Sequence, residues 1–182
     1  MVKLTFKPKQ VTKRILSPLQ DRAFDVIVSR FGLGTDAERK TLEAIGQAYD
    51  ITRERVRQIE ASALNAIRKS SEFQSEMQSF DELRQIVREL GALIAEEELL
   101  PLITKDESLQ NHLHFYFVLS DAFTKHKEDD HFRARWSIDD GLAQTVHNSL
   151  KKLYETISDD ELVREMISLS GTSSSETLRN YF

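Results

Sequence analysis

The chain has 182 residues, 40% of them hydrophobic, and its 25 Lys and Arg against 30 Asp and Glu give a formal net charge of −5. The hydrophobic share allows a real core and argues against wholesale disorder, and the lack of cysteine excludes disulfides, thiolate metal sites and cysteine nucleophiles. No apolar stretch approaches the roughly 18–20 residues of a membrane span, and the first ten residues lack the apolar core of a signal peptide. We therefore expect a soluble, cytoplasmic protein with no membrane partner.

The charge is distributed unevenly along the chain. Residues 1–70 hold 14 Lys and Arg against 8 Asp and Glu, a net charge of +6, whereas residues 71–182 hold 11 against 22, a net charge of −11. The total alone would argue against binding to nucleic acid. The asymmetry indicates instead that the basic third could face a polyanion while the acidic remainder faces something else.

The first predicted helix follows a basic lead-in. Residues 1–13 are rich in lysine and show no clear period, so we interpret them as a basic tail. Ser17 is suited to cap a helix, and Pro18 to occupy its first position. Apolar residues at helical spacing follow as far as Phe31, and Gly32 ends the helix.

Two helices separated by a short break are predicted next. Thr41 can cap the first, and Thr52 can cap the second, which continues to about Lys69 with its apolar residues on one face. Residues 70–79 are polar and are interpreted either as a linker or as a continuation of a helix. We place a domain boundary here, because the composition changes from basic to acidic.

The second predicted domain, residues 76–150, is acidic, helical and ends in a β-hairpin. Helical spacing of apolar residues indicates three helices, near residues 80–90, 96–103 and 109–120. The period then changes to two, which predicts that residues 132–138 form a strand paired with residues 123–128. Helical spacing returns later, and residues 151–182 are interpreted as a helical segment that could begin a further, truncated domain.

The predicted hairpin has a two-residue turn at Asp129 and Asp130. This register places Phe123 opposite Trp136 on one face. The other face then carries His126, Arg133 and Arg135. Three helices followed by a two-stranded hairpin is the order of a winged helix.

Residues 42–60, LEAIGQAYDITRERVRQIE, fit a helix-turn-helix at the positions with the strictest physical demands. Gly46 is the small residue that lets two helices approach closely. Asp50 occupies the turn, where a left-handed backbone is required and aspartate is among the few residues that tolerate it. Val56 and Ile59 supply the apolar face of the second helix. We therefore expect a mostly α fold, in which a helix-turn-helix domain precedes a helical, winged-helix-like domain with a small β-hairpin.

The outward face of the second helix carries a polar stripe in its first turns, formed by Arg53, Glu54, Arg57 and Gln58. Arginine can hold guanine edges, glutamate can accept from cytosine and glutamine can read adenine. The alternative is a solvent-exposed helix stabilised by ion pairs between side chains three or four residues apart, which is the usual meaning of a run of charged residues. That alternative leaves the helix-turn-helix pattern unexplained, so we favour a DNA-reading helix.

The run TLEAIGQAYDITRERVRQIEASAL, with DRAFDVIVSRFGLG upstream, resembles conserved region four of primary-type bacterial RNA polymerase sigma factors. The resemblance covers about residues 14–72. In that family the region recognises the promoter −35 element and docks on the flap of the polymerase β subunit. The resemblance therefore implies a sequence-specific DNA-binding transcription factor, with double-stranded promoter DNA and the RNA polymerase core as partners.

The resemblance also implies roles for six residues. The base readers are Arg53, Glu54 and Gln58. Arg57 touches backbone or base, and the phosphate contacts are Thr41 and Leu42. Ser62 and Ala66 stand where the family usually has basic residues, which predicts weaker and less salt-dependent binding. Segments like those that bind the polymerase coiled coil, read the −10 element and melt DNA are lacking, so we do not expect a complete sigma factor.

The acidic second domain resembles, more loosely, the winged-helix domain of the RNA polymerase delta subunit. Arg133 and Arg135 on the predicted wing are candidates for phosphate contacts, although the surrounding acidity favours at least as much a protein partner or an intramolecular clamp on the basic region-four face. The alternative function is accordingly a polymerase-binding modulator that contacts the flap or a sigma factor and has little DNA binding of its own.

No pattern in the sequence indicates catalysis. His126 and His131 flank the predicted turn and are interpreted as solvated turn residues rather than metal ligands. A phosphate-cradling glycine loop and a convincing nucleophile–base pair are both missing. We expect no enzymatic activity, no metal and no cofactor.

Overall fold

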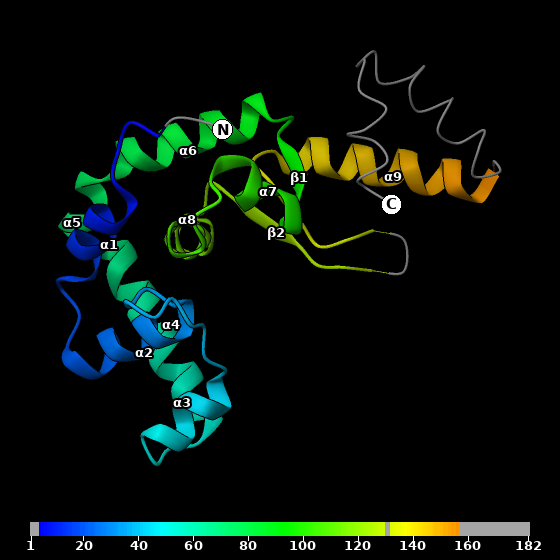
Figure 1. The fold of residues 1–182 in the computed structure, drawn as a ribbon. Helices are drawn as coiled ribbons and strands as arrows, with labels where there is room; N and C mark the ends of the chain where they lie inside the picture. The colour runs from blue at the N-terminus through cyan, green and yellow to red at the C-terminus, as the bar shows by residue number, and fades with distance from the viewer. Residues whose placement is uncertain (1–3, 130–131, 157–182) are drawn as a thin grey trace. The chain divides into compact units, whose positions relative to one another are not determined.

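The computed structural model describes residues 4–129 and 132–156, and helices dominate it (Figure 1). The helices are α1 (Pro8–Leu16), α2 (Asp21–Phe31), α3 (Leu42–Ala48), α4 (Arg53–Lys69), α5 (Ser71–Ser75), α6 (Met77–Glu89), α7 (Glu96–Ile103), α8 (Glu107–Leu119) and α9 (Asp140–Thr156). The strands are β1 (Leu93–Ala95), β2 (Thr124–His126) and β3 (Arg135–Ser137), in one antiparallel sheet with the order β1-β3-β2. The predicted fold class is confirmed. Within the described residues, every helix is too short or too polar to cross a bilayer.

Contacts divide the chain into two compact units. Unit 1 comprises residues 1–84 and 100–122, and unit 2 comprises residues 85–99 and 123–182. The elements from α6 to β3 follow one another in winged-helix order, helix-strand-helix-helix-strand-strand. Helix α8, the third helix in that order, nevertheless belongs to unit 1, with the helix-turn-helix.

Helix α8 forms much of the core of unit 1. It is apolar around most of its circumference, which is typical of a helix enclosed by others. Phe115 and Tyr116 are completely buried, and α8 packs against α1 and α2. The ring of Phe115 lies 5.0 Å from that of Phe31 in α2, and the ring of Tyr116 lies 5.1 Å from that of Phe80 in α6. The distances suit tilted aromatic pairs.

Helix α1 occupies residues that were predicted to be a tail, and that prediction is wrong. Pro8 stands at the first helical position, and the helix buries one face through Val11, Thr12 and Ile15. The hydroxyl group of Thr12 lies 3.0 Å from the Tyr116 hydroxyl, which itself donates to the carbonyl of Pro8 at 2.6 Å. The lysines between the apolar positions hid a helical period that a proline start could have indicated.

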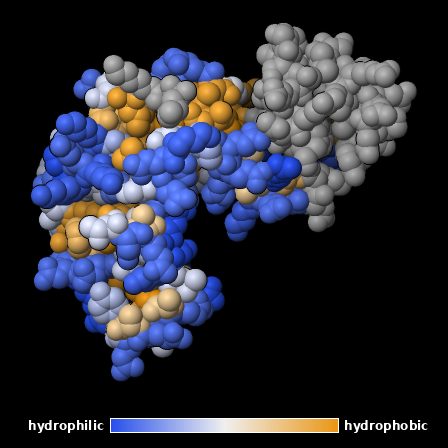
Figure 2. Space-filling view, viewed as in Figure 1, coloured by the Kyte–Doolittle hydropathy of each residue, from blue (hydrophilic) through white to orange (hydrophobic). Residues whose placement is uncertain are grey.

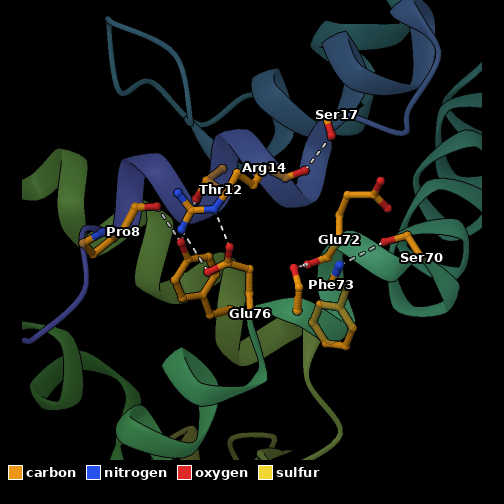
Figure 3. Close-up of polar contacts among 10 residues, drawn as sticks. Pro8, Thr12, Arg14, Ser17, Ser70, Glu72, Phe73 and Glu76 are labelled. Carbon is orange, nitrogen blue, oxygen red and sulfur yellow. Dashed lines mark hydrogen bonds and ion pairs between the residues drawn. The ribbon is translucent and has the colours of Figure 1, made fainter.

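The start predicted for the next helix is also wrong. Ser17 ends α1 rather than opening α2, and its hydroxyl donates to the carbonyl of Arg14 at 2.8 Å. Figure 3 shows this bond and the ion pair that joins Arg14 to Glu76. Helix α2 begins at Asp21. Ser17 and Pro18 therefore lie between two helices. The prediction placed a helix start there because it had not recognised α1.

The sheet of unit 2 differs from the predicted hairpin in register. Lys125, not Phe123, lies opposite Trp136. The backbone N–H of Asp129 donates to the carbonyl of Phe132 at 3.0 Å, so the strands are bridged one residue further along the chain than predicted. A register shift of two residues preserves the faces of a strand, and His126 indeed pairs with Arg135.

Two further features of unit 2 bear on the predictions. Strand β1 was not predicted, since three residues are too few to show a period. Of the segment predicted for residues 151–182, residues 151–156 belong to α9, and the rest lies outside the described residues.

Candidate nucleic-acid interface

The two helices of the predicted helix-turn-helix, α3 and α4, are capped as expected. The Thr41 hydroxyl oxygen accepts from the backbone N–H of Ala44 at 3.1 Å, and that of Thr52 accepts from Arg55 at 3.2 Å. Each bond satisfies one of the N–H groups that a helix leaves without a partner at its start. Both cap predictions are confirmed, and they fix where the recognition helix begins.

The turn between α3 and α4 confirms the prediction for its two special residues. Asp50 has a φ of 52°, in the left-handed region. A Cβ atom added to Gly46 would lie 2.7 Å from the carbonyl oxygen of Ile51, so a larger residue would push the turn away from α3. The carbonyl oxygen of Gly46 in turn accepts from the backbone N–H of Ile51 at 2.9 Å. Glycine therefore sets the close approach of the two helices.

The inward face of the helix-turn-helix packs against α2. Val26, Ile45 and Val56 form a fully buried cluster. Partly buried side chains surround it, namely Leu42, Tyr49, Ile51 and Ile59. This packing confirms the apolar face predicted for α4, and it holds the opposite face of α4 toward solvent.

The exposed face of α4 carries the four stripe residues. Arg57 forms two hydrogen bonds with the carboxylate of Glu54, both 2.8 Å long, and these hold the pKa of Glu54 below its ordinary value. The side-chain amide of Gln58 donates to the same carboxylate at 3.4 Å. Arg53 pairs across the turn with Glu43 of α3, at 3.2 Å. The stripe residues thus form hydrogen bonds and ion pairs with one another and with Glu43 of α3.

These ion pairs do not lock the stripe. Each pair is well exposed to solvent, and exposed pairs contribute little because water screens them and long side chains lose entropy when held. The same guanidinium and carboxylate groups can therefore turn to base edges or phosphates at small cost. At the end of Figure 1 where α3 lies, Figure 2 shows hydrophilic residues around a smaller, more hydrophobic patch.

The two residues expected to touch phosphate lie at the start of α3. Thr41 is the N-cap, and its hydroxyl proton remains free to donate, since the cap uses the oxygen as an acceptor. Leu42 is half-buried and packs on the helix-turn-helix core, so only its backbone could serve a phosphate. The structure thus brings all six implied positions to two adjacent helix starts.

The cations of the predicted wing have other partners. Arg135 is only 6% exposed, and its guanidinium lies 3.0 Å from Nδ1 of His147 and 4.8 Å from the centre of the Phe132 ring. Such burial is not compatible with a phosphate contact. Arg133 is exposed but pairs with Glu97 of α7. A glutamate in the acidic first turn of α7 therefore forms an ion pair with one of the two predicted wing arginines.

A basic residue near the end of α4 is also engaged within the protein. Nε of Arg68 donates to the carbonyl of Leu119 at 2.7 Å, and a terminal nitrogen donates to that of Val118 at 3.0 Å. Both carbonyls belong to the last turn of α8, where helical partners run out. Arg68 thus caps α8, which reduces further the number of cations that α4 can offer to phosphates.

The histidines near the hairpin do not form a metal centre in the described part of the chain. Nε2 of His126 lies 2.9 Å from the Ser137 hydroxyl and 4.0 Å from an Asp140 carboxylate oxygen. No group of three or more histidine or carboxylate side chains suited to a metal occurs among the described residues. His131 and Asp130 lie outside them.

The geometry of α3 and α4 defines a helix-turn-helix with an exposed polar second helix. Comparison with known proteins specifies its kind: residues 15–69 match the family described as sigma-70, region 4. The match confirms the predicted resemblance of this part of the chain to sigma region four.

Three curated relatives align with the same segment. They are the sigma factor SigA1 of Synechococcus elongatus (54% identity over 54 residues, 30% of this chain and 13% of the relative), the sigma factor RpoD of Neisseria gonorrhoeae (48% over 59 residues, 32% and 9%) and the sigma factor SigA of a Nostoc species (50% over 56 residues, 31% and 14%). The chain therefore spans only a small part of the length of the relatives it matches.

Proposed function

We propose that this protein takes part in transcription initiation by recognising promoter DNA, and that it reads a −35-like element with the start of α4. The observation that carries the proposal is the exposed stripe on α4, held outward by a buried core and set by the caps and by Gly46. The match to sigma-70 region 4 and the sigma factors among the relatives support it.

The proposed contacts follow from the chemistry of the stripe. Arg53, Glu54 and Gln58 would read base edges, because their donors and acceptors suit guanine, cytosine and adenine in the major groove. Arg57 would release Glu54 and bind a phosphate or a base. The hydroxyl of Thr41 would donate to a phosphate on the flank of the site, which orients the protein without reading sequence.

The decisive experiment is a binding titration with duplexes that the full chain selects from a random pool. Replacing Arg53 or Gln58 by alanine should weaken binding to matched duplexes by about 1–3 kcal/mol and relax the base preference at one position. Arg84→Ala is a charge-matched control, because Arg84 is exposed on α6 and lies outside the stripe. Unchanged affinity and base preference in the Arg53 and Gln58 variants would refute base reading by α4.

A second candidate function is contact with RNA polymerase rather than with DNA. Unit 1 has an open groove beside α4, lined mainly by small and apolar residues: Pro18, Leu19, Ala23, Ile59, Ala63 and Ala66. A partner helix, such as one from the polymerase flap, could lie in such a groove. If this is the main function, core polymerase should co-purify with the chain, Leu19→Asp should abolish the association, and duplex binding should be undetectable at moderate salt.

A further inference from the structure

A buried asparagine in α8 is bonded to the loop that leads into the helix-turn-helix. The Asn111 side chain is 7% exposed, and its amide nitrogen donates to the carbonyl oxygens of Gly32, at 3.1 Å, and Ala37, at 2.7 Å. Its amide oxygen accepts from Nε of Arg39 at 2.6 Å. One side chain therefore uses both of its N–H donors and its acceptor on the segment between α2 and α3.

The loop, residues 32–41, is tightly folded around this side chain. Gly32 and Ala37 both have left-handed backbones, with φ values of 61° and 52°. A Cβ atom on Gly32 would lie 2.7 Å from both the Ala37 carbonyl oxygen and the Asn111 amide nitrogen. Without the asparagine, these two carbonyl groups would lose their donor in a confined space, which is unfavourable.

The far end of the loop is the N-cap of α3, Thr41. Just before it, the backbone N–H of Lys40 donates to the carbonyl of Ser29 at 2.9 Å, and Arg30 donates to the carbonyl of Lys40 at 3.2 Å. Helix α2 thus holds Lys40, the residue before the cap, and Asn111 holds the stretch from residue 32 to residue 39. The position of Thr41 depends on both attachments.

We propose that Asn111 is a positioning residue for DNA binding: by fixing the loop before α3, it sets where the Thr41 side of the interface meets the DNA backbone. This inference rests on the proposed function, that the region-four segment binds duplex DNA. The base readers on α4 are held separately, by Gly46 and the Val26 cluster. Loss of Asn111 should accordingly weaken binding without changing base preference.

The test is a double-mutant cycle in the full chain, with the selected duplex. Asn111→Ala should lower affinity about fivefold, the equivalent of one hydrogen bond. Thr41→Asp preserves the cap of α3, because aspartate accepts the same bond, but places a negative charge against phosphate. In the Thr41→Asp background, Asn111→Ala should lower affinity no further, since the contact it positions is already lost.

Thr12→Val is the matched control. Thr12 is buried, and its hydroxyl group forms hydrogen bonds with Tyr116 and His112 of α8 rather than with the loop. It should lower the melting temperature, as Asn111→Ala does, and leave DNA affinity unchanged. An equal loss of affinity in both variants, or a full effect of Asn111→Ala in the Thr41→Asp background, would show that Asn111 serves stability alone and would overturn the inference.

Two results separate the inference from the function on which it rests. If the wild-type chain binds no duplex, the proposed function fails and the inference with it. If binding and the Arg53→Ala effect are normal but Asn111→Ala has no effect, only the inference fails. Should Asn111→Ala not fold, Asn111→Asp decides, because it keeps the size of the side chain and an acceptor for Arg39 but loses both N–H donors. It should weaken binding without changing base preference, and unchanged affinity would overturn the inference.

Discussion

Helices α4 and α8 hold the same place in two successive motifs, because each is the last helix of its set and would be the reading helix by order alone. They differ in what surrounds them. Helix α4 buries one narrow face and leaves Arg53, Glu54, Arg57 and Gln58 in solvent, whereas α8 is enclosed, with Phe115 and Tyr116 fully buried. The order of elements therefore does not decide which helix presents a polar face to solvent: α4 presents one, whereas α8 is enclosed.

The contrast extends to charge. Counted by unit, unit 1 holds 16 Lys and Arg against 15 Asp and Glu, a net charge of +1, and unit 2 holds 9 against 15, a net charge of −6. The strong asymmetry between residues 1–70 and the remainder therefore softens, because part of the acidic half folds with the basic segment. Removing residues 76–182 would take α8 away from unit 1, so such a truncation would report on folding rather than on masking of the proposed DNA-binding face.

The largest effect on the free energy of unfolding should come from removing a core side chain of α8. Phe115→Ala should lower the free energy of unfolding by about 3–5 kcal/mol, since a fully buried phenylalanine leaves a cavity. Arg57→Ala on the exposed face of α4 should change it by less than about 0.5 kcal/mol. Urea unfolding of both variants measures the difference. A small loss for Phe115→Ala would mean that α8 is not part of the core.

A smaller effect on the free energy of unfolding should appear at acidic pH, through His112 of α8. Burial, with a lesser contribution from Lys9, lowers the pKa of His112 from 6.5 to about 4. Between about pH 4 and pH 6.5, His112 is neutral in the native chain but protonated in the unfolded chain. The contribution of neutral His112 to the free energy of unfolding is therefore complete above about pH 6.5 and declines as the pH falls toward 4. The decline should amount to at most about 3 kcal/mol. His112→Gln, which stays neutral, should flatten the unfolding free energy between these pH values, and an unchanged profile would refute the assignment.

The smallest effect should come from adding to α4 a cation that the resemblance to sigma region four leads us to expect at residue 62. Ser62→Lys should raise DNA affinity and steepen the dependence of log affinity on log salt by about 0.9, the value for one added phosphate contact. Ser75→Lys adds the same charge to α5 and should leave the slope nearly unchanged. Titrations at several salt concentrations measure both, and equal slopes in the two variants would argue against a phosphate near residue 62.

Much of the helix-turn-helix could be predicted, because its signals are local. A threonine cap bonds a residue three positions away, and a left-handed aspartate or a crowded glycine acts within one turn. The identity of the stripe residues likewise follows from helical spacing. Their ion pairs were foreseen only as the alternative to DNA reading, whereas the proposed function requires the same side chains to serve both roles.

Features that depend on distant parts of the chain could not be read from spacing. Helix α1 is stabilised on one face by contacts such as the Tyr116 hydroxyl with the carbonyl of Pro8, 108 residues away, so its lysines gave a misleading impression of a tail. The hairpin register depends on where Asp129 meets Phe132, and an Asp-Asp pair specifies a turn weakly.

The sequence by itself determined the region-four segment, its caps, its turn and its outward-facing residues, since each depends on neighbours within a few positions. Only the tertiary structure decided that α8 supports this segment, that Arg68 caps α8 and that Asn111 braces the loop before α3. Those roles arise from pairs at least 50 residues apart. The physical reason is that periodicity reports which side of a helix avoids water, but not which other element covers it.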